Sequence, residues 1–88
     1  MSSYKVSVGN AKPVRVKNIR DARSIVAEAI TGFIARDPEG GARGAMTTNS
    51  AFDSGAAEHS LTAHGSWSTT VTVEGEQVLL AIIKKRWW

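Results

Sequence analysis

Apolar and polar residues alternate in two short segments near the start of the chain. Residues 4–8 read YKVSV and residues 12–17 read KPVRVK, and both show the period of two that is typical of a half-buried strand. A three-residue loop over residues 9–11 would pair Val6 with Val14 and place the apolar side chains of both strands on one face. The pattern therefore predicts a β-hairpin.

The same register gathers positive charge on the other face of this hairpin. Lys5 lies directly across from Arg15, and Lys17 follows two residues later on the same strand. Because like charges opposed across a ladder are mildly destabilising, we expect a compensating contact such as a bound anion. Pro13 lacks the N–H that a central strand donates, so the second strand is expected at an edge of its sheet.

The next segment repeats its apolar residues at intervals of three and four. Asn18 is a suitable N-cap, and Asp21 lies three positions later, where a carboxylate favours the helix dipole. Asp37-Pro38 ends the pattern, because the residue before a proline is disfavoured in the helical conformation. These signals predict an amphipathic helix that packs on a sheet. Its apolar stripe consists of Ile19, Ala22, Ile25, Val26, Ala29, Ile30, Phe33 and Ile34.

Residues 38–65 show no clear period and are rich in glycine, alanine, serine and threonine. The composition predicts a long loop, with a mobile stretch from Gly40 to Ser50. A short helix is expected near its end. Asp53 or Ser54 would cap that helix, and Gly65 would end it.

A second hairpin is predicted after this loop. The segment SWSTTVTV over residues 66–73 alternates strictly and is rich in β-branched residues, and Glu74-Gly75 suits a two-residue turn. The expected register pairs Val71 with Val78, Thr69 with Leu80 and Trp67 with Ile82. The sequence therefore indicates a ββαββ protein of the α+β class, a single domain over residues 1–88, with an antiparallel sheet of about four strands and one helix across one face.

The last predicted strand is apolar on both faces. Leu79, Ala81 and Ile83 alternate with the residues that this register assigns to the core. One helix covers only one face of such a sheet, so this second apolar surface needs a cover of its own. Either the loop over residues 38–65 supplies it, or a second copy of the protein or another partner does.

Composition and charge limit the classes of function. The 88 residues suit one domain, contain no cysteine and include no apolar run long enough to span a bilayer. The segment MSSYKVSVGN lacks the apolar core of a signal peptide, so a cytoplasmic protein without membrane contact is expected. The net charge of +3 is unevenly distributed, with basic segments on either side of an acidic middle. This distribution favours an anionic partner.

No catalytic, metal or cofactor site is expected. His59 and His64 are five residues apart, which places them about 140° apart on a helix and so on different faces. Ser60 lies near both, but the chain has no GxSxG elbow of a serine hydrolase. Residues 40–44, GGARG, lack the Lys-Ser/Thr pair of a phosphate-binding loop.

Two functional hypotheses remain, and the stretch KKRWW after the last apolar run bears on both. The first is a small non-enzymatic binding protein that acts on a protein partner, in the way that viral or mobile-element inhibitors block host machinery. The partner in this hypothesis includes a second copy of the protein, in a homodimer. Trp and Arg suit such an interface. Its predicted residues are Leu79, Ile83, Arg86, Trp87 and Trp88.

The alternative hypothesis is nucleic-acid binding through the basic hairpin and the tail, because cations on a sheet or ribbon can contact phosphates. The residues predicted for it are Lys5, Arg15, Lys17, Lys84, Lys85 and Arg86. An enzyme that uses His59 and His64 is the third and weakest hypothesis.

Overall fold

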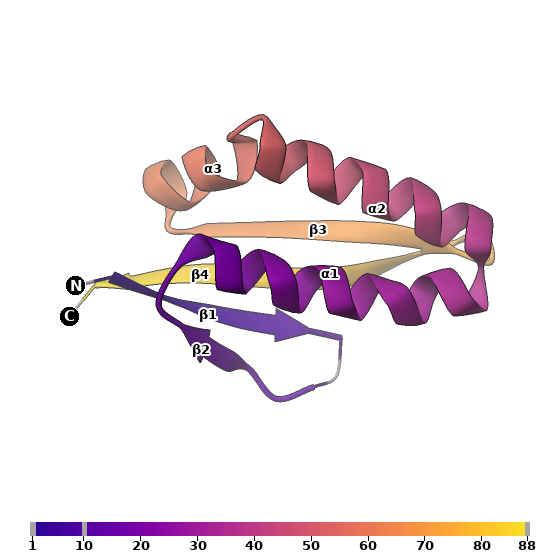
Figure 1. Cartoon of the computed structure of the whole chain (residues 1–88), viewed down its shortest axis with the longest axis horizontal. Helices are drawn as coiled ribbons and strands as arrows, with labels where there is room; N and C mark the ends of the chain where they lie inside the picture. Colours follow the sequence, from indigo (N-terminus) through magenta and orange to yellow (C-terminus); the bar gives the residue numbers. More distant parts are fainter. Residues whose placement is uncertain (1, 10, 88) are drawn as a thin grey trace.

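In the residues that the structure describes, the chain folds into four strands and three helices (Figure 1). The structure, a computed structural model, describes residues 2–9 and 11–87, and the side chains of residues 3–9 and 11–86. The elements in order are β1 (Ser2–Val8), β2 (Val14–Val16), α1 (Ile19–Arg36), α2 (Pro38–Asp53), α3 (Ala56–His64), β3 (Ser66–Val73) and β4 (Glu76–Trp87).

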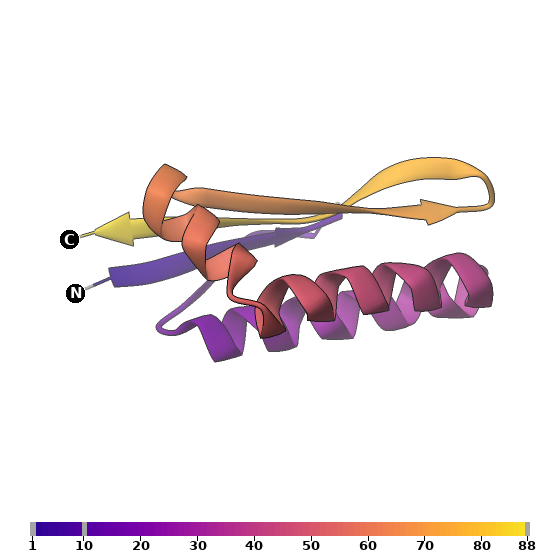
Figure 2. The same ribbon diagram turned by 90° about the horizontal axis from the view of Figure 1, so that it is seen from above.

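The strands form one antiparallel sheet in the order β2-β1-β4-β3. The first and last strands of the chain therefore pair in the centre, and each hairpin contributes one edge strand. Helix α1 packs against β1 and β4, whereas α2 and α3 pack against β3. Figure 2 shows α1 and α2 together on one side of the sheet, whereas α3 runs across the end of the sheet beside β3, and neither α1 nor α2 lies on the opposite side. We call that opposite side the open face.

The predicted α+β class and four-stranded antiparallel sheet are confirmed, but the predicted ββαββ order with a single helix is wrong. Three helices, not one helix and a long loop, lie between the hairpins. All of the core lies between these helices and the sheet. Its largest fully buried apolar side chains are Val6, Val26, Leu61, Leu80 and Ile83.

Helix α1 begins and ends where its sequence signals predicted. The Asn18 side chain accepts a hydrogen bond from the backbone N–H of Asp21 at 2.8 Å, which satisfies one N-terminal donor that has no partner inside the helix. Ala22, Val26 and Ile30 lie on one stripe and are buried against the sheet.

Helix α2 occupies the segment that was predicted to be a mobile loop, and that prediction is wrong. Glycine inside a helix costs about 1 kcal/mol relative to alanine, so a segment with three glycines reads as a poor helix. The glycines are needed because α2 packs very closely on its neighbours. A Cβ on Gly41 would lie 2.5 Å from the Ile34 Cα, and a Cβ on Gly44 would lie 2.5 Å from a Val71 methyl carbon.

The short helix predicted at the end of this segment is confirmed as α3. It ends at Gly65, which adopts the left-handed conformation with φ of 76°. Its N-cap is Gly55 rather than the predicted Asp53 or Ser54, and no side chain caps its first turn. Leu61 carries α3 into the core.

Asp37 joins α2 to the second hairpin. Its side chain caps α2 by accepting a hydrogen bond from the Gly40 N–H at 3.2 Å. The same carboxylate accepts a hydrogen bond from the Glu74 N–H, in the β3–β4 turn, at 2.9 Å. The bond from Glu74, with the second bond from Gly40, lowers the pKa of Asp37 below its ordinary value of 3.8.

The first hairpin has the predicted register. Val6 pairs with Val14 and Lys5 pairs with Arg15, and β2 lies at an edge of the sheet as Pro13 required. The two cations are therefore opposed across the ladder.

The second hairpin contains a β-bulge that changes its register. Val71 pairs with Val78 as predicted, but the pairing shifts between Thr69 and Thr70 and leaves Leu80 as the extra residue. Beyond the bulge the prediction is wrong by one residue. The observed pairs are Thr69 with Ala81 and Trp67 with Ile83, in place of Thr69 with Leu80 and Trp67 with Ile82.

The bulge decides which residues of β4 reach the core. Leu80, Ala81 and Ile83 are all 0% exposed. Because side chains alternate along a strand, Ile82 takes the place that was expected for Ile83, on the open face after Leu79. The predicted position of Ile83 on a second, uncovered apolar face is therefore wrong.

Candidate functional site

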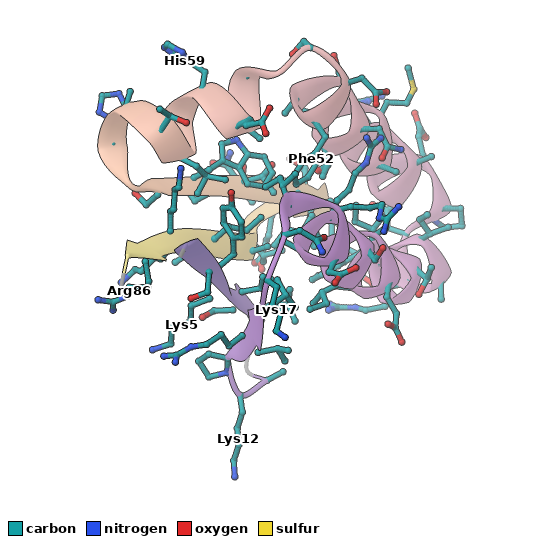
Figure 3. The ribbon with its side chains drawn as sticks, turned by 60° about the vertical axis from the view of Figure 1, so that its left-hand side comes forward. Lys5, Lys12, Lys17, Phe52, His59 and Arg86 are labelled. Atoms are coloured by element: carbon teal, nitrogen blue, oxygen red, sulfur yellow. The ribbon has the colours of Figure 1, made fainter. Side chains whose placement is uncertain are left out.

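The open face carries a row of cations across three neighbouring strands. Lys5 on β1 pairs with Arg15 on β2 at one side and with Lys84 on β4 at the other. Directly paired residues point to the same face of a sheet, so these three side chains lie together. Arg86 lies two residues beyond Lys84 and pairs with Ser3, which adds a fourth cation to the same face. Figure 3 shows Lys5 and Arg86 on the same side of the sheet, away from α1.

The described residues of the open face include no carboxylate. The chain has eight acidic residues. Five lie in the helices and Asp37 lies between α1 and α2. Glu74 and Glu76 lie at the β3–β4 turn, where Glu76 pairs with Val73, whose side chain faces the helices. The fold therefore separates the charges and gives the open face a positive potential.

Small polar side chains make up much of the remainder of this face. Those of β3 are Ser66, Ser68, Thr70 and Thr72. Their hydroxyl groups can donate hydrogen bonds to anionic oxygens. Leu79, which is 48% exposed, and the half-buried Ile82 form a small apolar area between the hydroxyls and the cations.

Aromatic side chains whose positions are described face the helices instead. Trp67 packs edge-on against Phe52 of α2, with ring centroids 5.0 Å apart. Tyr4 pairs with Lys85, whose side chain points to the helix side because it lies between Lys84 and Arg86 along β4. The described part of the open face therefore has no ring on which a base can stack.

The residues predicted for the two hypotheses are divided by the fold. Lys5, Arg15, Lys84 and Arg86 are brought together on the open face, as is Leu79. Ile83 lies in the core and Lys85 lies on the helix side. Lys17 lies in the bend between β2 and α1. Trp87 ends β4 opposite Ser2, while its side chain and all of Trp88 lie outside the described residues.

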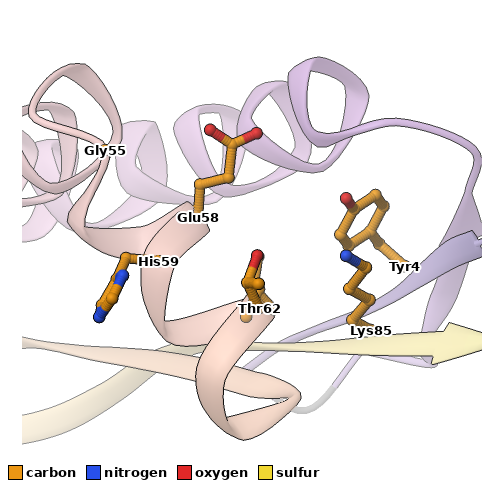
Figure 4. A pocket seen from close by; sticks show the side chains of 7 residues that line it. Tyr4, Gly55, Glu58, His59, Thr62 and Lys85 are labelled. Carbon is orange, nitrogen blue, oxygen red and sulfur yellow. The ribbon is translucent and has the colours of Figure 1, made fainter.

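One hollow of about 370 Å³ lies on the helix side, between α3 and the end of the sheet (Figure 4). Its polar lining includes Lys85, Tyr4, Thr62 and Glu58. Figure 4 shows the amine of Lys85 beside the Tyr4 ring and His59 pointing away from both. Because the cation Lys85 and the carboxylate of Glu58 both line this hollow, its charge favours neither an anionic nor a cationic ligand.

The histidines do not join a reactive cluster. His59 and His64 are exposed on α3, and no group of three or more metal-ligating side chains occurs in residues 2–9 and 11–87. The acidic and hydroxyl side chains near them have other partners. Asp53 forms an ion pair with Arg23 at 2.8 Å, and the Ser60 hydroxyl donates to the Ser66 carbonyl oxygen at 2.8 Å.

The described helices include none that is both long and apolar enough to cross a membrane. Comparison of the chain with protein families, with curated proteins and with solved structures found no match.

Proposed function

We propose that this protein binds nucleic acid through the open face of its sheet. The observation that carries the proposal is the convergence of Lys5, Arg15, Lys84 and Arg86 on a face whose described residues include no carboxylate. Phosphate contacts by Lys and Arg supply most of the affinity of sequence-independent binding. Serine and threonine hydroxyls on the same face add hydrogen-bond donors for phosphate oxygens.

The proposed mode of binding is recognition of the sugar-phosphate backbone. Single-strand binders stack bases on aromatic side chains, and the described open face offers none. Direct reading of bases requires a helix or a two-stranded ribbon in a groove. The cations of the open face lie across three strands of a four-stranded sheet, not on a helix or a two-stranded ribbon, so binding is expected to depend on charge and only weakly on base sequence.

A second candidate function is the protein-binding role that the KKRWW stretch suggested. It is favoured by Leu79, a large apolar side chain that is 48% exposed beside the cations. A partner for this surface would carry carboxylates opposite Lys84 and Arg86. The two candidates differ in whether the protein binds nucleic acid, which the following experiment measures.

The test is charge reversal on the open face. We expect wild-type affinity for a 20-base-pair duplex to fall with a log–log salt slope of about 3 to 4, which is roughly 100-fold between 50 and 200 mM salt. Lys84→Glu with Arg86→Glu is expected to lower the slope by about 2 and to weaken binding by at least roughly 100-fold at low salt. Fluorescence anisotropy over a salt series measures both.

The matched control is Arg20→Glu with Arg36→Glu on α1. Each pair of changes takes the formal net charge from +3 to −1, because each replacement removes one positive charge and adds one negative charge. Only the open-face pair is expected to abolish binding. Equal losses in both pairs, with both variants folded by circular dichroism, would show that net charge and not this face is responsible. Absence of duplex binding by the wild type would reject the proposal.

A further inference from the structure

Strand β3 is an edge of the sheet whose sequence does little to prevent the addition of a further strand. It spans Ser66–Val73, and β4 is its one neighbour in the described sheet. Edge strands are normally protected by short length, charged side chains, proline or a bulge of their own. The opposite edge, β2, has three residues and follows Pro13. In contrast, β3 has eight residues without charge or proline, and the bulge of its hairpin adds the extra residue to β4.

The backbone groups of β3 alternate between β4 and the outer edge. The Gly65 carbonyl oxygen accepts a hydrogen bond from the Lys85 N–H at 2.9 Å, so the odd-numbered residues of this segment bond to β4. The even-numbered residues therefore direct their N–H and C=O groups away from the sheet. These residues are Ser66, Ser68, Thr70 and Thr72.

The helices close the two ends of this outer edge and leave its middle free. At one end, the Ser60 hydroxyl of α3 donates to the outward carbonyl oxygen of Ser66 at 2.8 Å. At the other end, α2 covers the Thr72 carbonyl oxygen so closely that a Cβ on Gly40 would collide with it. Between these ends, the described residues form no hydrogen bond to the outward groups of residues 68 and 70 or to the N–H of residue 72. The open part of the edge therefore covers residues 68–72.

A groove of about 200 Å³ lies beside this open part, between β3 and α2. Thr70 and Thr72 line it from β3, and Thr47 lines it from α2. Figure 1 shows α2 alongside β3, and the two elements are in contact. Gly40 and Gly44 also line the groove, so the helix carries no side chain at two of its positions there. The groove therefore has room for small side chains of a strand added next to β3.

The charges around the groove differ between its two ends. The exposed Glu74 and Glu76 lie at the β3–β4 turn, close to the Thr72 end. Arg43 is the cation that lines the groove, and it pairs with Glu39 at 3.4 Å. The turn end therefore keeps an excess of negative charge. A basic side chain at that end of an added strand would complement it.

A second copy of the chain does not suit this edge. Antiparallel pairing of two β3 strands would place both α2 helices on the same side of the joined sheet. Paired strands lie about 4.8 Å apart, whereas packed helices need about 8–10 Å between their axes. Because α2 packs on β3 itself, the two helices would overlap. A single extended peptide brings no helix with it and avoids this overlap.

We propose that the outer edge of β3, over residues 68–72, is a docking site for an extended peptide segment of a partner protein. The segment adds as a further strand, antiparallel to β3 like every other pair in the sheet. Its side chains that face α2 are small, and its N-terminal end carries a basic residue beside the β3–β4 turn. This inference is independent of the proposed nucleic-acid binding, because it uses backbone groups of the edge and not the cations of the open face.

The experiment titrates ¹⁵N-labelled protein with a seven-residue peptide that is capped at both ends. In this peptide a lysine precedes alternating threonine and alanine, so that the alanines face α2. The amide signals of Ser68, Thr70 and Thr72 are expected to shift, and their exchange with solvent is expected to slow. Because the open edge offers about five hydrogen bonds, we expect a dissociation constant of roughly 0.1–1 mM.

Two N-methylated peptides are matched controls for strand pairing. A methyl group on the nitrogen of the middle threonine removes the donor that faces β3 and is expected to weaken binding at least about 10-fold. A methyl group on the next alanine, whose N–H points away from β3, is expected to change the affinity less than about threefold. Glutamate in place of the lysine is expected to weaken binding about threefold or more at low salt.

Two variants test the groove on the protein. Thr47→Trp fills it from an exposed position of α2 and is expected to abolish peptide binding. Met46→Trp adds the same ring at a neighbouring position that is 74% exposed and is not part of the groove lining, and it is expected to bind as wild type does. Thr70→Pro removes an outward N–H of the edge strand and has the same expectation as Thr47→Trp. Circular dichroism measures whether each variant is folded.

Three results would overturn the inference. The first is no change at the amides of Ser68, Thr70 and Thr72 with up to about 10 mM peptide. The second is equal affinity for the two N-methylated peptides, and the third is equal peptide binding by folded Thr47→Trp and Met46→Trp. Shifts of the same amides that grow with protein concentration alone would assign the edge to a second copy of the chain and would also overturn it.

Discussion

At the scale of single residues, Asp37 links two parts of the fold that are distant in sequence. Its carboxylate accepts hydrogen bonds from Gly40 at the start of α2 and from Glu74 in the β3–β4 turn. The Gly40 N–H belongs to the first turn of α2, where backbone donors have no partner inside the helix. One ionised side chain thus fixes the position of α2 relative to the hairpin.

This arrangement predicts a specific dependence of stability on pH. Because the folded-state pKa of Asp37 lies below its ordinary value of 3.8, its carboxylate stabilises the protein above that value. The contribution is lost as the pH falls through the folded-state pKa. Asp37→Asn, which keeps a capping oxygen but no charge, should be less stable than the wild type near pH 7. The difference should shrink toward about pH 3.

Urea unfolding over that pH range measures the difference. Glu39→Gln is the control, because the exposed Glu39 side chain pairs with Arg43 and accepts no backbone hydrogen bond that would fix an element. A gap between wild type and Asp37→Asn that stays constant with pH would contradict the role assigned to the charge.

At the scale of elements, α2 is a helix whose composition opposes helix formation and whose packing requires that composition. Gly41 lies against the backbone of Ile34 in α1, and Gly44 lies against Val71 in β3. The element therefore depends on close approach to its neighbours. Signals of it exist in the sequence, since Asp37 is a good N-cap and Pro38 suits the first helical position. The same Asp37-Pro38 pair also ends α1, and the sequence-based prediction assigned it only that role and not the start of α2.

A pair of glycine replacements tests this dependence on packing. Gly41→Ala is expected to destabilise the protein by about 1–3 kcal/mol or more, because the added methyl group would meet the Ile34 backbone at 2.5 Å. Gly32→Ala is the control. Gly32 is exposed on α1 with nothing within 4 Å of its Cβ position, so alanine there should stabilise by up to about 1 kcal/mol. Chemical denaturation of both variants measures the two effects, and equal effects would contradict the packing argument.

At the scale of the whole molecule, the strand order separates the charges. The basic segments at the two ends of the sequence become neighbours because β1 pairs with β4. Five of the eight carboxylates lie in the helices, beside four arginines, and two more lie at the β3–β4 turn. A modest net charge of +3 thereby becomes a positive sheet face and a helical face that carries most of the carboxylates. Polarity of this kind steers the approach of an anionic partner.

The same separation of charge predicts the oligomeric state of the protein in solution. Two open faces brought together would oppose four cations with four cations around the small apolar area of Leu79. We therefore expect a monomer of 9.4 kDa at low ionic strength without nucleic acid. Light scattering with size-exclusion chromatography measures the mass. A stable dimer of wild type that dissociates on Leu79→Ser would instead support the homodimer hypothesis.

The local signals of the sequence determined α1, α3, the first hairpin and the turn of the second. Caps, apolar periods and turn residues act over a few positions, so they are readable without knowledge of the rest of the chain. They also determined that Lys5 and Arg15 oppose each other, because hairpin register follows from the loop and the alternation.

The tertiary structure alone decided the remainder. The three glycines of α2 predict a loop from the sequence, because glycine has a low helix propensity. Only the tertiary structure shows that close packing of α2 on its neighbours offsets this propensity. The bulge at Leu80 moved Ile83 into the core, and nothing in the alternation of β4 distinguishes an added residue from a regular one. Above all, pairing of β1 with β4 is a contact between the ends of the chain. Only that contact places Lys84 and Arg86 beside Lys5, and so creates the candidate site.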